Sequence, residues 1–389
     1  MSVPVMFIDG DVIEAHSRWT DDGSRIVTEA TVRGSDGQEV VVSQLGGSVD
    51  GIGMIQMPGQ EILTPGMHVA AVVHGDVDLA QREHIVLDSV RVMAYPEGFV
   101  RTGPTKAGHP LKWESGCVFV TIDAAGTTAI PGDGEFPVID ASIATWNDAT
   151  VNASCSYLTV MSQGKKAMEV GNDKVNVIKF RDTTWGRPAV GNDPARTYNP
   201  QAAGITTAIY IDDAASGRDG AILDADIELN GVDFDISIAG QTSGPPGKCL
   251  AELQNTLTHE LGHLHGLEHP CRVVGDPTNR VDDKGNPVPD CSTVQATPTL
   301  PANMKILEAT MFNFQECGET KKETLSDDDI QSMCSIYPAS APHSCQAVGS
   351  TGGGGCCSAS GRDRPELAFL LAGTTLLALR RRRKKSLDA

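Results

Sequence analysis

Residues 259–270 read HELGHLHGLEHP, and this stretch constrains the chain more than any other. Leucines recur at steps of three and four through residues 248–264, a period that predicts a helix with one buried apolar face. On such a helix His259 and His263 are four residues apart, so both imidazoles project from the same face. At that separation the two rings can bind a single metal ion at about 2.0–2.1 Å.

Gly266 and His269 extend this pattern beyond the helix. A glycine at a helix end readily adopts the left-handed conformation, which turns the chain sharply. The turn brings His269 back toward His259 and His263 as a third ligand. Three histidines with one open position are typical of a catalytic zinc site. Glu260 lies beside the first ligand, where it can accept a proton from an attacking water. The alternative is a polar helix end exposed to solvent.

Two further polar residues of the stretch are expected to take no part in the site. His265 is two residues from His263, so it points away from the ligand face of the helix. Glu268 is expected to be a carboxylate exposed to solvent.

The eleven residues HELGHLHGLEH resemble the signature of the metzincin zinc endopeptidases. Among metzincins the chain is most similar to the matrixins, through a tryptophan-containing helix at 137–147, the strand DADIELN at 224–230 and a helix at 324–338. The resemblance covers about residues 112–338. It implies an α+β catalytic domain with a twisted mixed sheet, an active-site helix and a C-terminal helix. It also implies zinc-dependent hydrolysis of peptide bonds, with Glu260 as the general base.

The same resemblance implies a methionine turn beneath the zinc. Met311, in EATMFNF, is the best match, and Met304 is the alternative. Matrixins place this methionine soon after the third histidine, whereas a long segment separates His269 from Met311 here, which predicts an inserted loop at the rim of the cleft. Asn313 stands where astacins and serralysins have a tyrosine ligand, so that ligand is absent. The resemblance also implies structural calcium, for which the aspartates of residues 212–235 are candidates.

The implied partners are proteins or peptides. An extended substrate is expected to pair with an exposed strand edge, and residues 225–229 are the candidate strand. Nucleic acid is not an expected partner, because the chain has 31 Lys and Arg against 50 Asp and Glu, a net charge of −19. Binding to phosphates requires a basic face.

The ten cysteines are scattered through the chain after the N-terminal region, and none forms a CxxC pair. Scattered cysteines in an acidic chain indicate disulfides in an oxidising compartment, although buried free thiols are the alternative. Proximity alone suggests the pairs Cys271–Cys291 and Cys317–Cys334. We therefore expect a secreted or cell-surface protein. Residues 1–11 lack the features of a signal peptide, so either export uses another route or the natural chain begins upstream, and we expect the second.

Composition divides the rest of the chain into segments. Residues 1–95 read as short strands between Gly, Pro and Asp turns, typical of a small all-β accessory domain, either a barrel or a sandwich. Residues 96–110 read as a linker, and residues 111–338 as the matrixin-like catalytic domain. The strands expected in these segments are 26–32, 39–43, 69–73, 85–92, 175–180, 206–211 and 225–229.

The C-terminal tail has a composition of its own. Residues 339–361 form a Gly, Ser and Cys-containing tether, and residues 362–389 contain an apolar run at 367–379 followed by six basic residues. That run is shorter than the roughly 20 residues of a spanning helix, but the basic end favours membrane association. The tail resembles the C-terminal sorting signals of exported myxobacterial proteins. This resemblance implies attachment to the bacterial envelope and processing or lipidation at Cys356 or Cys357, whereas the alternative is an amphipathic tail on a cytosolic protein.

Two functions are consistent with these features. The first is a zinc endopeptidase that cleaves extracellular proteins. The second is a surface-anchored binding protein that retains the zinc fold without proteolysis. Glu260 favours the first, because a purely structural zinc site needs no base beside its ligand.

Overall fold

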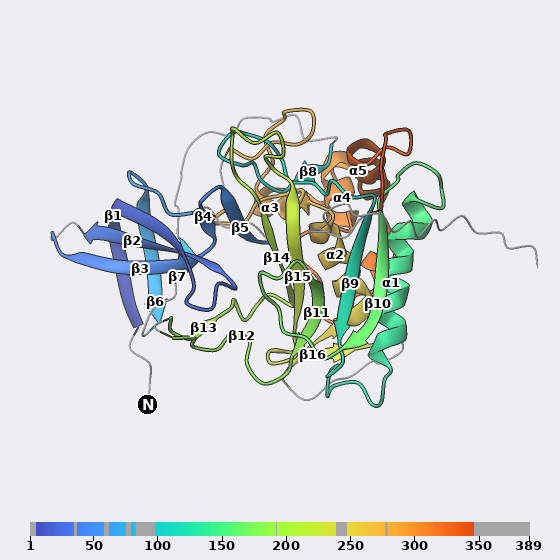
Figure 1. The fold of residues 1–389 in the computed structure, drawn as a ribbon, viewed down its shortest axis with the longest axis horizontal. Helices are drawn as coiled ribbons and strands as arrows, with labels where there is room; N and C mark the ends of the chain where they lie inside the picture. Colours follow the sequence, from blue (N-terminus) through green and yellow to red (C-terminus); the bar gives the residue numbers. More distant parts are fainter. Residues whose placement is uncertain are drawn as a thin grey trace, which may run out of the picture. The chain divides into compact units, whose positions relative to one another are not determined.

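A seven-stranded mixed sheet forms the centre of the fold (Figure 1). In order across the sheet, its strands are β10 (Thr159–Lys166), β9 (Cys117–Asp123), β11 (Asn176–Arg181), β15 (Ile222–Asn230), β14 (Gly204–Ile211), β5 (Ile52–Met57) and β4 (Gly47–Val49). The first four are mutually parallel, and β14 runs antiparallel to both of its neighbours. The expected α+β class with a mixed sheet is confirmed. The prediction that residues 225–229 form an exposed edge for substrate is wrong. These residues belong to β15, which lies between β11 and β14.

The computed structural model describes most of the chain. The described residues are 5–34, 37–57, 62–74, 79–82, 98–191, 193–238, 247–276 and 279–345. The strand expected at 85–92, the cysteines Cys356 and Cys357, and the apolar and basic tail lie outside them. Among the described residues, no helix is long and apolar enough to cross a membrane.

The N-terminal residues form a second, antiparallel sheet of five strands. Its order is β3 (Glu39–Leu45), β2 (Ile26–Gly34), β1 (Val5–Trp19), β6 (His68–His74) and β7 (Leu79–Arg82). These strands include those expected at 26–32, 39–43 and 69–73. The chain then passes from β3 into β4 and β5 of the seven-stranded sheet. Hydrogen-bonded strands therefore join the region before residue 95 to the region after it.

The helix that carries the histidines, α2 (Leu253–Leu264), is shorter than the leucine pattern of 248–264 predicts. Residues Cys249–Glu252 instead form a strand, β17, which runs parallel to β16 (Phe234–Ser237). The last residue of that strand caps the helix, because its carboxylate accepts the backbone N–H of Asn255 at 2.6 Å. The apolar residues therefore belong to two successive elements, which a single period cannot separate.

Two further helices flank α2 in the sequence. They are α1 (Glu135–Thr150) and α5 (Asp327–Ile336), and both fall within the expected helical segments or overlap them. At the start of α5 the backbone N–H of Ser326 donates to the carboxylate of Asp329. The main core lies between the sheet and these helices. The remaining elements are β8 (Val100–Arg101), β12 (Gly186–Arg187), β13 (Arg196–Thr197), β18 (Leu267–Glu268), α3 (Cys291–Ala296), α4 (Pro301–Glu308) and the 3-10 helix η1 (Lys321–Glu323).

Four disulfides connect distant parts of this core: Cys117–Cys345, Cys155–Cys334, Cys249–Cys317 and Cys271–Cys291. The predicted pair Cys271–Cys291 is confirmed. The predicted pair Cys317–Cys334 is wrong, because Cys317 lies beside β17 and Cys334 lies on α5 next to the end of α1. Four disulfides are consistent with an oxidising, extracellular compartment.

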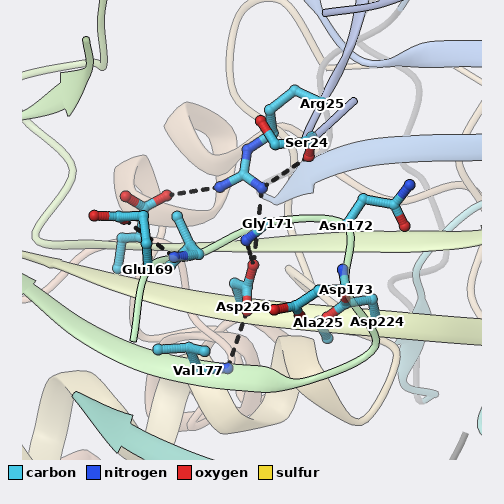
Figure 2. A network of polar contacts seen from close by, with 12 residues as sticks. Ser24, Arg25, Glu169, Gly171, Asn172, Asp173, Val177, Asp224, Ala225 and Asp226 are labelled. Carbon is cyan, nitrogen blue, oxygen red and sulfur yellow. Dashed lines mark hydrogen bonds and ion pairs between the residues drawn. The ribbon is translucent and has the colours of Figure 1, made fainter. Parts of the chain in front are cut away.

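A buried charged network connects the N-terminal strands to the seven-stranded sheet (Figure 2). Arg25, immediately before β2, is 3% exposed and lies 3.8 Å from Asp226 and 3.5 Å from Glu228, both on β15. The loop before β11 and the start of β11 both contact Asp226, because the backbone N–H groups of Gly171 and Val177 donate to its carboxylate. The network therefore combines residues from three separate segments of the chain.

Asp224, on the same strand, is a buried carboxyl group whose ionised form is disfavoured. One of its oxygens accepts the backbone N–H groups of Asp173 and Lys174, while the other has no hydrogen-bond partner among the described residues. Burial raises the pKa of Asp224 to about 7. An unfolded aspartate has a pKa of about 3.9, so ionising Asp224 in the folded protein opposes folding increasingly as the pH rises from about 4 to about 7.

Asp224→Asn should therefore remove a destabilisation of the folded protein that increases with pH. The free energy of unfolding of the variant relative to the wild type should increase by roughly 3–4 kcal/mol between pH 4 and pH 8, since the pKa is raised by about three units and each unit corresponds to about 1.4 kcal/mol. Denaturant titrations at the two pH values measure this difference. Asp148→Asn, at an exposed position on α1, is the control. A difference between Asp224→Asn and wild type that does not change with pH would contradict the assignment.

Candidate metal centre

The three predicted histidine ligands lie together. His259 and His263 project from α2, and His269 follows β18. The Nε2 atom of His269 is 3.1 Å from Nε2 of His259 and 3.2 Å from Nε2 of His263. All three side chains are buried, and their donor atoms lie within 4.8 Å of one another. This group can hold one metal ion.

The donor positions fit a tetrahedral ion. Two nitrogens bound at about 2.0–2.1 Å in tetrahedral geometry are roughly 3.3–3.4 Å apart, close to the observed separations. The Nδ1 atoms of His259 and His263 lie 2.8 Å from the carbonyl oxygens of Thr310 and Leu267. A proton on each Nδ1 donates to its carbonyl, so each Nε2 carries a free lone pair. Burial holds the pKa of His259 and of His269 well below the usual range, which keeps both rings neutral.

The third ligand is oriented by Asn313. The amide nitrogen of Asn313 lies 2.8 Å from Nδ1 of His269, and its amide oxygen lies 3.1 and 3.2 Å from the sulfurs of Cys271 and Cys291. Those sulfurs form a disulfide and have no proton to donate to that oxygen. Turning the amide by about 180° instead lets its oxygen accept the Nδ1–H of His269. In that orientation Nε2 of His269 also carries a free lone pair.

Gly266 makes the expected turn between the second and third ligands. Its φ is +89°, in the left-handed region, and a Cβ at this position would lie 2.9 Å from the carbonyl oxygen of Leu111. The chain leaves the turn as β18, which pairs with β8. His269 follows β18, so its Nε2 atom lies near the Nε2 atoms of His259 and His263. The third ligand therefore depends on the N-terminal half of the chain as well as on α2.

Glu260 points from α2 toward the start of β14. Its Oε2 accepts the hydroxyl proton of Thr206 at 2.7 Å. A Cβ on Gly204 would lie 2.7 Å from its Oε1, so this glycine leaves the space that the carboxylate occupies. Glu260 is 4% exposed, and burial raises its pKa. The structure thus places a buried, oriented carboxylate one residue from the first histidine.

Met311 packs directly against the backbone of α2. A Cβ on Gly262, the residue before the second histidine, would lie 2.1 Å from the sulfur of Met311. Met311 is buried, whereas Met304 is 52% exposed on α4. Of the two candidates for the methionine turn, Met311 is therefore the one in contact with the histidine helix.

The two polar residues expected outside the site are both buried. The prediction of an exposed Glu268 is wrong, because its carboxylate accepts the backbone N–H of His269 and lies 3.5 Å from Arg280. Arg280, in the inserted segment, also donates to the carbonyl oxygen of His269 at 3.0 Å. His265 does not join the triad, and its ring packs against Trp146 with centroids 4.7 Å apart. The role of Arg280 was not predicted from the sequence, because no residue spacing or motif connects Arg280 to the three histidines.

Tertiary hydrogen bonds fix the histidine helix in place. The indole N–H of Trp146, on α1, donates to the carbonyl oxygen of Thr258 at 2.9 Å. The hydroxyl of Tyr337, after α5, donates to the carbonyl oxygen of His265 at 2.7 Å. Both ends of the metal-binding stretch are therefore held by the flanking helices.

No protein-family model matches this chain, and no curated protein matches it significantly. The histidine triad is the one group of metal-ligand side chains that the described residues bring together. The aspartates of residues 212–235 do not form a second such group within that part of the chain, so the structure assigns no calcium ligands.

Asn313→Leu should lower the metal affinity of the protein about 10–100-fold, because the residue that orients His269 is lost while its volume is kept. Competition with a chromophoric chelator measures this affinity. Asn152→Leu, at an exposed position after α1, provides a matched control. Wild-type affinity in Asn313→Leu would show that this amide does not orient the third ligand.

Proposed function

We propose that this chain is a zinc-dependent endopeptidase of the metzincin type, which hydrolyses peptide bonds of extracellular proteins. The observation that carries the proposal is the convergence of three histidine Nε2 atoms beside the buried carboxylate of Glu260. Three neutral imidazoles are a donor set that suits zinc and leaves one coordination position open. The four disulfides support an extracellular site of action.

The proposed reaction is the addition of water to an amide carbonyl followed by cleavage of the C–N bond. A zinc ion held by His259, His263 and His269 would supply Lewis acidity, which would acidify an attacking water and polarise the scissile carbonyl. Glu260 takes a proton from the attacking water and returns it to the leaving nitrogen. The hydroxyl of Thr206 occupies one lone pair of Oε2, so Oε1 is the oxygen available for this transfer.

The second candidate is a surface-anchored binding protein that retains the zinc fold without proteolysis. The burial of the site favours it, since His259 is 8% exposed and Glu260 4% exposed. A site this covered can hold an ion without admitting a long peptide. The two functions make opposite predictions about cleavage.

Cleavage of unstructured proteins distinguishes them. The zinc-loaded protein should cut casein or gelatin into fragments detectable by mass spectrometry, a chelator should stop the cutting, and added zinc should restore it. Glu260→Ala is the control for contaminating proteases. A preparation that binds one equivalent of zinc but yields no more fragments than Glu260→Ala would favour the binding protein.

A further inference from the structure

The strand that contacts Glu260 has no free edge along most of its length. Thr206, whose hydroxyl donates to Glu260, lies opposite Met57 of β5, and the pairing continues to Ile211 opposite Ile52. The other edge of β14 pairs with β15. Extended peptides commonly bind enzymes and receptors by adding a strand to an open edge. The edge nearest the general base is therefore already filled by the chain itself.

We propose that β5 is a built-in occupant of the peptide-binding edge of β14, through which the N-terminal strands restrain substrate binding at the metal centre. This inference rests on the proposed function. Gly204 and Ile205, the first two residues of β14, are the ones that do not pair with β5. An incoming peptide can pair there only briefly before it meets β5.

The end of β5 is also linked, through Thr102, to the strand that leads to the third ligand. The hydroxyl of Thr102 lies 3.1 Å from the sulfur of Met57 and 3.0 Å from the carbonyl oxygen of Leu267. Leu267 opens β18, the short strand before His269. Met57 thus pairs with the strand that orients the base and contacts Thr102, the residue that hydrogen-bonds the strand before the third histidine.

Charged contacts hold the N-terminal strands against the rest of the protein. Arg18, on β1, lies 2.7 Å from Asp193 in the β12–β13 hairpin, and the backbone N–H of Asp21 donates to the same carboxylate. Arg25 contributes the buried contacts to β15 that Figure 2 shows. Charged and polar contacts of this kind are sensitive to single substitutions. Arg18 is partly exposed whereas Arg25 is buried, so the pair Arg18–Asp193 is the better place to loosen the strands.

Binding of two hydroxamates tests the proposal without requiring catalysis. Acetohydroxamate is a small chelator of zinc, and the same group on an extended tripeptide needs the strand edge as well. In the wild type the tripeptide should improve affinity less than about threefold. In Arg18→Ala/Asp193→Asn it should improve affinity at least about tenfold, or about 1.4 kcal/mol, since the edge becomes available.

A matched control and a cross-link complete the test. Arg33→Ala/Glu39→Gln removes an ion pair of 2.7 Å within the N-terminal sheet and should behave as wild type. Gln56 and Thr207 lie directly opposite each other, so Gln56→Cys/Thr207→Cys can form a disulfide between β5 and β14. Added to the loosened variant, this disulfide should abolish the gain in affinity of the tripeptide hydroxamate over acetohydroxamate.

Two results would overturn the proposal alone: no gain in the loosened variant, or an undiminished gain after cross-linking, in each case with normal binding of acetohydroxamate. Failure of zinc-loaded wild-type protein to bind acetohydroxamate at all would contradict the proposed zinc centre itself, and this inference with it.

Discussion

Glu260→Gln is expected to lower the rate of peptide hydrolysis about 10²–10⁴-fold while the protein keeps one zinc ion per chain. Glutamine fills the same space between Gly204 and Thr206, but it cannot accept the proton of the attacking water. Initial rates on a quenched fluorescent peptide, with zinc content measured on the same samples, give the two quantities together.

Glu114→Gln is the matched control for this substitution. Glu114 is partly exposed and pairs with Arg218 at the surface, so its loss should leave the rate unchanged. Loss of zinc from Glu260→Gln, or equal activity in the two variants, would contradict the role of Glu260 as the general base.

Gly262→Ala is expected to destabilise the protein by about 1–3 kcal/mol through overpacking and to weaken zinc binding. The added Cβ would lie 2.1 Å from the sulfur of Met311 and 3.1 Å from the ring of Trp146, so either the buried Met311 side chain or the helix between the two histidine ligands must shift. Helix propensity alone predicts the opposite sign, a gain of about 1 kcal/mol for alanine over glycine. Denaturant unfolding and zinc titration therefore separate the two effects.

The double variant Gly262→Ala/Met311→Ala identifies the contact responsible. Removing the methionine side chain makes room for the new Cβ, so the double variant should be less destabilised than the sum of the two single variants. Additive effects, or a stabilised Gly262→Ala, would show that Met311 does not lie against the helix in solution.

The histidine triad could be predicted from the sequence because its geometry is local. His259 and His263 share one helix face, and the glycine at position 266 turns the chain so that His269 follows within a few residues. The orienting residues could not be predicted. Arg280 reaches His269 from the segment between His269 and Met311, and Asn313 reaches it from the residues just after Met311, along paths that depend on the folded core.

Long-range pairing accounts for the other differences between expectation and structure. Cys317 pairs with Cys249 because β17 and the segment after Met311 meet in space, and sequence proximity carries no information on such contacts. The N-terminal strands have the alternating pattern of a separate β domain. Nothing in that pattern indicates that β5 joins the central sheet, since a strand's partner is set by tertiary structure.

The most direct test of the central claim is zinc K-edge X-ray absorption on the zinc-loaded protein, combined with anomalous diffraction to locate the ion. The account predicts one ion bound by His259, His263 and His269 at about 2.0–2.1 Å, with one oxygen from solvent as the fourth ligand. An ion located elsewhere, or one closed by four protein ligands, would contradict it.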